Sequence, residues 1–239
     1  MYALFKKEIR YFFTSPIGLT IIGLFIVLNG LFLWVFKTDY NIFNAGFADM
    51  LPFFRLSSWF FVFLVPALTM RSISEEKKSG MLALLFTKPV STLQMVLGKY
   101  LGILFLLFVI LLPSALYVYM VWVLGNPVGN LDIAGTVGSY IALFLLVATF
   151  ASVGLWASSI SSNQIISFVL AAFLCFFFFF GIDQLIAFIA PEDFGGVGFQ
   201  THFDAISRGV LDTRNIVYFL SVISFFIYLT TLSLKAYKR

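Results

Sequence analysis

Six long apolar runs, separated by short charged stretches, are the feature that most constrains this 239-residue chain. A bilayer core about 30 Å thick needs about 20 helical residues to cross it, and lipid offers no partner to exposed backbone groups. Only 11% of the residues are charged, against roughly 25% in a soluble domain. The sequence therefore predicts an all-α integral membrane protein with one transmembrane domain over residues 1–239. We place its six spans at approximately Pro16–Phe36, Leu51–Met70, Gln94–Val123, Ala134–Ser158, Gln164–Ile182 and Ile216–Leu234.

The basic residues are divided unequally between the two sides of the membrane. If both termini lie on one side, that side holds about 11 of the 15 Lys and Arg residues, and an excess of Lys and Arg marks the cytoplasmic side. We therefore expect both termini, and the segment between spans two and three, to be cytoplasmic.

Residues 1–15 have the pattern of an amphipathic helix that lies flat in the membrane surface. The apolar residues fall at i, i+4, i+7 and i+8, on one face, and the basic residues project elsewhere, towards anionic head groups. A simple basic anchor that fixes topology is the alternative, since the positive-inside rule alone would produce these charges. The apolar set is Phe5, Ile9, Phe12 and Phe13, and the basic set is Lys6, Lys7 and Arg10.

Residues 71–90 form a charged segment between two apolar runs and are the candidate contact with another protein. Ser72-x-x-Glu75 is a capping-box pattern, and Ser91-x-x-Gln94 repeats it at the start of span three. An ordinary solvated hairpin loop is the alternative, although a simple connection needs few residues. The candidate contact residues are Arg71, Glu75, Glu76, Lys77, Lys78 and Gly80.

We expect a short helix from Ile73 to about Phe86 in this segment. Gly80 weakens its middle and is able to divide it, and Lys88-Pro89 ends it because the residue before proline avoids the α region. The expected apolar contacts are Ile73, Met81, Leu84 and Leu85.

Residues 183–215 form the longest expected external loop, which would cap the outer mouth of the bundle. Asp204 and Arg208 stand at i, i+4 and are able to pair on a short helix, which Gly209 would end. His202 is expected to be a surface histidine. The candidate residues of this loop are Phe203, Asp204, Arg208, Gly209 and Asp212.

Several functions are excluded by what the sequence lacks. There is no G-x-x-x-x-G-K-[ST] phosphate loop, and no nucleophile–base pair that would supply catalytic residues. One histidine and one cysteine give neither a metal cluster nor a disulfide, and Cys175 is expected to pack as a small hydrophobe. Basic residues spread along a membrane face do not indicate nucleic-acid binding. The near absence of charge within the spans argues against a proton- or sodium-driven transporter.

Three motifs together resemble the ABC-2 type transporter permeases over essentially the whole chain. They are Phe5-Lys6-Lys7-Glu8-Ile9-Arg10, then Arg71-x-x-x-Glu75-Glu76-Lys77-x-x-Gly80, then Lys88-Pro89-Val90-Ser91 followed by Gly98-Lys99. The closing Phe203-Asp204-x-x-Ser207-Arg208-Gly209-Val210-x-Asp212 is similar to the subgroup that contains the gliding-motility-associated permease subunit of Bacteroidota. One departure is Met81, where the family usually has a small residue, often Thr.

The resemblance implies a role for each segment in a bacterial inner-membrane complex. Residues 1–15 would be the elbow helix, and residues 71–90 would be the coupling helix that docks on a separate cytoplasmic ABC ATPase. That partner binds ATP, so this chain needs no cofactor of its own. The six spans would pair, among membrane lipids, with a second permease subunit, either identical or different. A different subunit would be able to carry a large extracytoplasmic domain. A non-transporting scaffold or mechanotransmitting subunit driven by an ATPase is the alternative.

Overall fold

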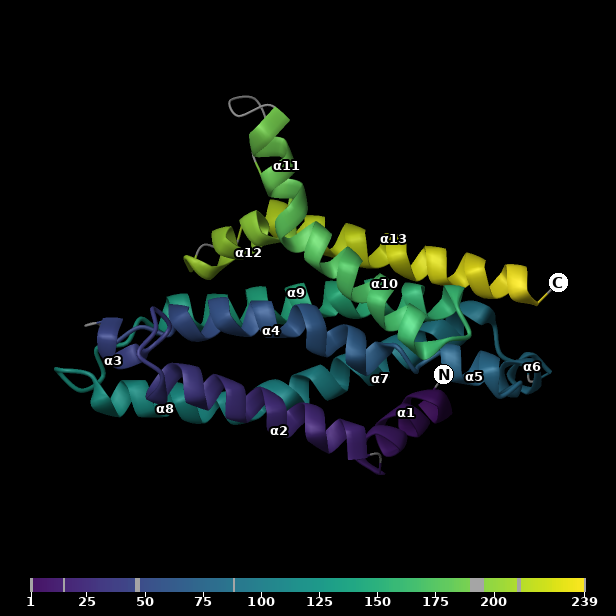
Figure 1. Ribbon diagram of the computed structural model, residues 1–239, viewed down its shortest axis with the longest axis horizontal. Helices are drawn as coiled ribbons and strands as arrows, with labels where there is room; N and C mark the ends of the chain where they lie inside the picture. Colours follow the sequence, from purple (N-terminus) through teal and green to yellow (C-terminus); the bar gives the residue numbers. More distant parts are fainter. Residues whose placement is uncertain are drawn as a thin grey trace.

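The computed structural model describes residues 2–14, 16–45, 48–87, 89–189, 196–209 and 212–238. Ser15, Lys88, Val210 and Arg239, which enter the sequence predictions, lie outside these residues. The fold is a bundle of helices (Figure 1). The α-helices are α1 (Tyr2–Thr14), α2 (Pro16–Gly30), α3 (Ile42–Ala45), α4 (Leu51–Thr69), α5 (Ser74–Lys78), α6 (Met81–Phe86), α7 (Thr92–Leu111), α8 (Ala115–Leu124), α9 (Ile133–Ile160), α10 (Gln164–Phe176), α11 (Ile182–Ile189), α12 (Phe199–Ser207) and α13 (Thr213–Tyr237).

The expectation of six spans is confirmed. In the described part of the chain, six helical stretches are long and apolar enough to cross a membrane. They run Gly18–Val35, Leu51–Lys78, Thr92–Leu124, Ile133–Ile160, Gln164–Ile189 and Thr213–Tyr237. The third and fourth spans are long, as the sequence predicts, and the second continues into the charged segment.

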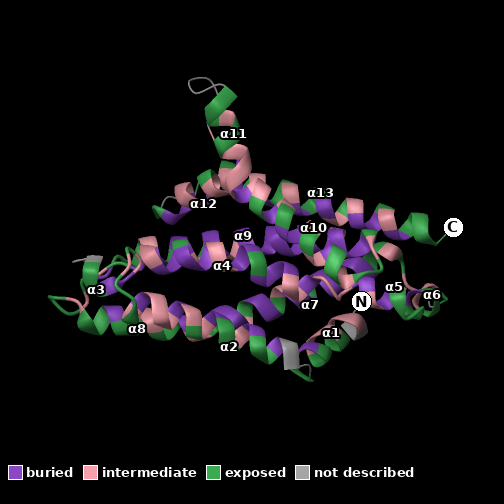
Figure 2. Ribbon diagram, viewed as in Figure 1, coloured by how far each residue is buried: buried purple, intermediate pink, exposed green. Residues whose placement is uncertain are grey.

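Helix α9 is the centre of the bundle. It packs against α4, α7, α10, α12 and α13. In its most apolar stretch of 18 residues 78% of the residues are buried, against 22% in the corresponding stretch of α13. Figure 2 shows the resulting concentration of buried residues along α9. The small residues Ala151, Gly154 and Ser158 are all buried, and a Cβ added at Gly154 would lie 2.1 Å from Oγ1 of Thr69. The small-residue stripe of α9 therefore packs inside the subunit, against α4.

The charged segment and both chain ends lie at the same end of the bundle (Figure 1). We call this the basic end, defined by α1, α5, α6 and the last turns of α13. Helix α3 and the last turn of α8 lie at the opposite end. Helix α1 packs against α7 and α2. The basic end is thus built from segments that are far apart in the sequence.

Three spans contain irregular turns. The first continues from α2 through a π-helical turn at Leu31–Val35, and the fifth has a π-helical turn at Phe177–Gly181. The third breaks at the 3₁₀ turn Leu112–Ser114, where Pro113 removes a backbone donor. Pro66, by contrast, lies within α4 without interrupting it. Proline therefore interrupts the third span but not the second.

The described parts of residues 183–215 are largely helical, whereas the sequence predicts a loop with one short helix. Helix α11 projects away from the bundle (Figure 1), whereas α12 packs against α9 and α13. Phe199, Phe203 and Ile206 of α12 are almost fully buried. The apolar face of a short helix thus covers the end of α9.

His202 and Arg208 also differ from expectation. His202 is not a free surface histidine, because its ring stacks on Tyr218 with 3.9 Å between centroids, and Nδ1 lies 2.7 Å from Oδ1 of Asn215. Helix α12 ends at Ser207 and Arg208 is its C-cap, so the i, i+4 helical pair with Asp204 does not form. Gly209, with φ of +85°, ends the helix as predicted.

Candidate functional site at the basic end

A buried lysine is the centre of the basic end. Lys99 on α7 has only 1% of its side chain exposed. Its Nζ lies 2.8 Å from Oε1 of Glu8 on α1 and 3.0 Å from Oε2 of Glu76 on α5. It also donates a hydrogen bond of 2.7 Å to the carbonyl of Ser72. A buried cation needs both paired charges and hydrogen bonds to offset its lost hydration, and Lys99 has both.

Glu76 extends this network to a second lysine. Its Oε1 lies 2.8 Å from Nζ of Lys7, and Lys7 also contacts Sδ of Met81 at 3.4 Å. We call Lys7, Glu8, Glu76 and Lys99 the junction. Two positive and two negative charges balance within it, and they join α1, α5 and α7.

Small residues on α7 allow α1 to approach closely enough for these pairs. Gly98 and Gly102 are both buried, and a Cβ added at Gly102 would lie 2.8 Å from Cβ of Glu8. One turn further along α7, Phe105 makes an edge contact with Phe5 at 6.0 Å between centroids. The sequence thus brings Glu8 to Lys99 by placing glycines, rather than bulky residues, under α1.

The predicted elbow residues divide into two faces. Phe12 is buried, and Phe5 and Ile9 are half-buried, while Phe13 is 41% exposed. Lys6, Lys7 and Arg10 are exposed. The amphipathic helix is therefore present, and much of its apolar face packs on the bundle. Its role as an elbow remains a prediction.

Residues 71–90 form two short helices rather than one. Gly80 adopts φ of +71° between α5 and α6, a conformation that favours glycine. The capping box predicted at Ser72 is wrong, because α5 begins at Ser74 and has no side-chain cap. The capping box at Ser91 and Gln94 is confirmed.

Ser158 of α9 replaces the missing cap. Its Oγ accepts hydrogen bonds of 3.0 Å from the backbone N–H groups of Ile73 and Ser74, and donates one of 3.0 Å to the carbonyl of Met70. A residue on another span thus satisfies the turn that joins α4 to α5.

The remaining charged residues of the segment mostly point inward as well. Lys77 donates to the carbonyl of Ser159 and lies over the ring of Tyr237 at 4.9 Å. Glu75 accepts a hydrogen bond of 3.0 Å from the hydroxyl of Tyr11. Burial, and then Glu75 itself, raises the pKa of Tyr11.

The exposed surface of the segment is largely apolar. Ile73 and Leu82 are fully buried, whereas Met81 is 43% and Leu84 66% exposed. The predicted apolar contacts are thus right for Ile73 and for Leu85, which packs against the core, and wrong for Met81 and Leu84. Leu82 turns inward instead. Lys78 and Gly80 are exposed beside them.

The candidate residues at the opposite end serve a different purpose. Phe203 is part of the core, and Asp212 caps α13 by accepting from the backbone N–H of Arg214 at 2.9 Å. Burial raises the pKa of Asp204, and the nearby Arg55 and Arg208 partly offset this. These residues stabilise helix ends rather than assemble a reactive centre.

The described residues contain no group of three or more His, Cys, Asp or Glu that would hold a metal ion. Cys175 is fully buried and packs as a small hydrophobe, as predicted. Reasoning from the sequence missed Glu8 and Lys99 as site residues. The available signal was a lone lysine that follows a glycine in a long apolar run, together with the only acidic residue of α1.

A family model described as ABC-2 family transporter protein matches residues 2–238. The chain therefore belongs to the ABC-2 transporter family. Members are membrane permease subunits that work with an ABC ATPase and are not themselves catalytic. A comparison with curated proteins finds no match.

Proposed function

We propose that this chain is the membrane subunit of an ATP-driven exporter and that its junction passes the movement of the ATPase to the spans. Lys99, buried on α7 between Glu8 and Glu76, is the observation that supports this proposal best. Because these ion pairs hold α1, α5 and α7 together, a displacement of the 71–90 segment would move all three.

The proposed contact with the ATPase uses the outward face of the 71–90 segment. Lys78 and Gly80 are exposed, next to Met81 and Leu84. Glu75, Glu76 and Lys77 would act indirectly, because they make contacts within the subunit. Arg71 would also act indirectly, because its Nε is buried. This divides the predicted coupling residues into those that touch the partner and those that position the segment.

The proposed complex lies in a bacterial inner membrane with both termini in the cytoplasm. The excess of Lys and Arg at the basic end supports this orientation. A second permease subunit, identical or different, would complete the pathway, and a different one would be able to carry a large extracytoplasmic domain. The narrower role in gliding motility is supported by the Phe203–Asp212 pattern alone. Deleting the gene in a gliding host and observing normal colony spreading would contradict that narrower role.

The central test is the ATPase activity of the permease reconstituted with its partner ABC ATPase. Leu84→Asp should prevent association, because it places a charge on an exposed apolar contact, while leaving the permease folded. Glu76→Gln should keep association but lower the stimulation of ATP hydrolysis. Lys6→Gln, at an exposed position of α1, is the control and should change neither the association nor the stimulation of ATP hydrolysis. Normal association and normal stimulation in both test variants would contradict the proposed coupling.

The alternative is a scaffold or mechanotransmitting subunit that uses the same contacts without moving a substrate. An exporter subunit and a scaffold subunit would both associate with the ATPase. They differ in transport, so export by proteoliposomes containing the complete complex separates them.

A further inference from the structure

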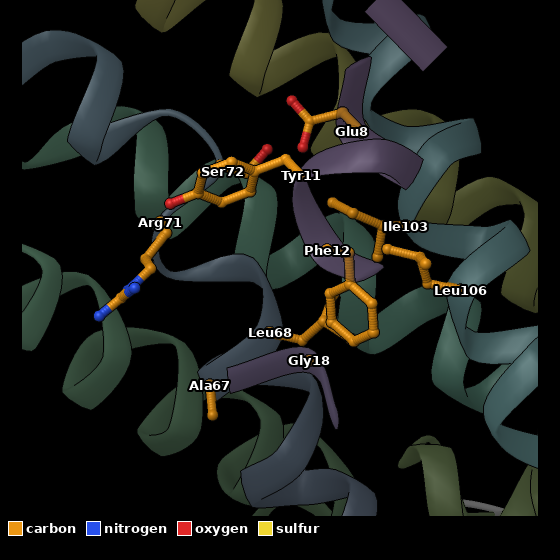
Figure 3. Close-up of a pocket in the computed structure, with 10 residues that line it drawn as sticks. All are labelled: Glu8, Tyr11, Phe12, Gly18, Ala67, Leu68, Arg71, Ser72, Ile103 and Leu106. Carbon is orange, nitrogen blue, oxygen red and sulfur yellow. The ribbon is translucent and has the colours of Figure 1, made fainter. Parts of the chain in front are cut away.

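A small pocket adjoins the junction where α1, the start of α2, the end of α4 and α7 meet (Figure 3). One part of its lining is apolar and includes Phe12, Leu68 and Ile103. The other part carries the polar groups of Tyr11, Arg71 and Ser72. The enclosed volume is about 40 Å³, and one water needs roughly 10–15 Å³ by this measure. The pocket therefore accepts about three waters or a single compact polar group.

Two polar atoms of this pocket are buried without a hydrogen-bond partner. Nε of Arg71 and Oγ of Ser72 are among the few such side-chain atoms in the part of the chain that the structure describes. A buried donor without an acceptor costs roughly 1–3 kcal/mol, and folded proteins satisfy most such groups. Both groups are able to donate, so they would be satisfied by a ligand that supplies acceptor oxygens.

The charges around Arg71 favour an anionic ligand. Within the described residues, no carboxylate lies within ion-pair distance of its guanidinium. The two carboxylates near the pocket already have partners, because Glu8 is paired with Lys99 and Glu75 accepts from the hydroxyl of Tyr11. Arg71 points away from Glu8 (Figure 3). Phosphate oxygens match the planar donors of a guanidinium particularly well.

The position of the pocket identifies where such a phosphate would come from. Gly18 begins the first span and Leu68 lies in the last turn of α4, whereas Arg71 and Ser72 follow directly in the charged segment. The polar part thus lies at the level of lipid head groups and the apolar part at the level of acyl chains. The exposed Lys6 and Arg10 of α1 would attract anionic lipids to the same surface.

We propose that this pocket binds the phosphate of a phospholipid from the leaflet at the basic end. Arg71 and Ser72 hold the phosphate oxygens, and Phe12 and Leu68 contact the beginning of the acyl chains. The lipid would therefore touch α1 and α4 at once, beside the junction. The site does not depend on ATPase coupling, and the test below contains no ATPase.

The test is the retention of lipid by the purified permease in detergent, measured by native mass spectrometry after addition of phosphatidylglycerol. Arg71→Gln should bind about tenfold or more weakly, the loss expected for a charge-assisted hydrogen bond. Arg55→Gln is the matched control, because Arg55 is an exposed arginine at the other end of α4. Diacylglycerol, which has the same chains but no phosphate, should not be retained. Equal retention by wild type and Arg71→Gln, or retention of diacylglycerol, would overturn the proposal.

Ser72→Ala gives a second measurement that does not require loss of Arg71. In delipidated protein it should leave the melting temperature unchanged or raise it, because it removes a buried hydroxyl that has no partner. With phosphatidylglycerol present, the variant should gain less thermal stability than wild type. Inorganic phosphate is the last ligand to be tested. If phosphate alone stabilises wild type as much as the lipid does, the site binds free phosphate and the lipid assignment is wrong.

Discussion

Charged side chains at the two ends of the bundle do different physical work. At the basic end, the junction joins three elements, and its Glu8–Lys99 pair spans 91 residues of sequence. At the opposite end, Asp132 and Asp212 each accept a backbone hydrogen bond at the start of the helix they precede. Asp132 and Asp212 thus fix where helices begin, whereas the charges of the junction fix how separate helices meet.

The difference matters because the two kinds of contact respond differently to mutation. A helix cap contributes roughly 0.5–2 kcal/mol. Removing one partner of a buried ion pair costs roughly 3–5 kcal/mol, because the other charge stays buried without compensation. The comparison therefore predicts that the most sensitive charged positions lie at the basic end.

The largest effect is expected for Lys99→Met. This change leaves Glu8 and Glu76 facing each other without the buried cation, so the free energy of unfolding should fall by about 3–5 kcal/mol. Unfolding by denaturant in detergent micelles measures it. Lys78→Met, at an exposed lysine of the same end, should change stability by less than about 0.5 kcal/mol. Equal losses of unfolding free energy in the two variants would contradict the conclusion that the buried junction is the most sensitive charged site.

Glu8→Gln should have a smaller effect at the same site. Glu76 remains to pair with Lys99, and the amide oxygen still accepts a hydrogen bond, so we expect a loss of about 1–3 kcal/mol. In a double-mutant cycle with Lys99→Met, the two changes should be non-additive by about 0.5–3 kcal/mol. Strict additivity would show that Glu8 and Lys99 do not interact in solution.

The features predicted correctly from the sequence depend on neighbouring residues. The six spans follow from the length of each apolar run, and the Ser91 capping box from two residues three positions apart. The division at Gly80 follows from the backbone freedom of a single residue. These signals lie within one helix, so no knowledge of the tertiary structure is needed.

The features that were missed depend on distant residues. Ser72 has the right spacing for a cap, but Ser158 makes the bonds at this turn from 85 residues away. The sequence alone predicts a surface histidine at His202, because its partners, Asn215 and Tyr218, belong to another helix. The same holds for Lys99 and Glu8, whose pairing requires the close approach of α1 to α7.

Asp183 tests a carboxylate at the opposite end that is not a helix cap. It accepts from the backbone N–H of Gly198 at 2.7 Å and from the hydroxyl of Thr201 at 2.9 Å, which ties α11 to the start of α12. Asp183→Ala should lower the free energy of unfolding by about 0.5–1.5 kcal/mol, the net contribution of a typical hydrogen bond. Faster hydrogen exchange at the backbone amides of α12 would locate the effect. Asp39→Ala, at an exposed position, is the control, and α12 should be unchanged in it.

The smallest effect is expected for Asp204→Asn, also at the opposite end. Burial raises the pKa of Asp204, so the environment disfavours its charge, and Arg55 and Arg208 only partly offset this. Loss of the carboxylate should therefore change stability at neutral pH by no more than about 0.5 kcal/mol, in contrast to Glu8→Gln.

The pH dependence of Asp204 gives the sign of its contribution. A raised native pKa means that the folded protein binds this proton more tightly than the unfolded chain. The contribution of Asp204 to stability is therefore fully present below the unfolded pKa and is lost as pH rises through the native pKa. As pH rises from the unfolded pKa to the native pKa, the free energy of unfolding of wild type should fall relative to that of Asp204→Asn. A shift in its favour would mean that Asp204 is paired as strongly as the carboxylates of the junction, and the contrast between the two ends would no longer hold.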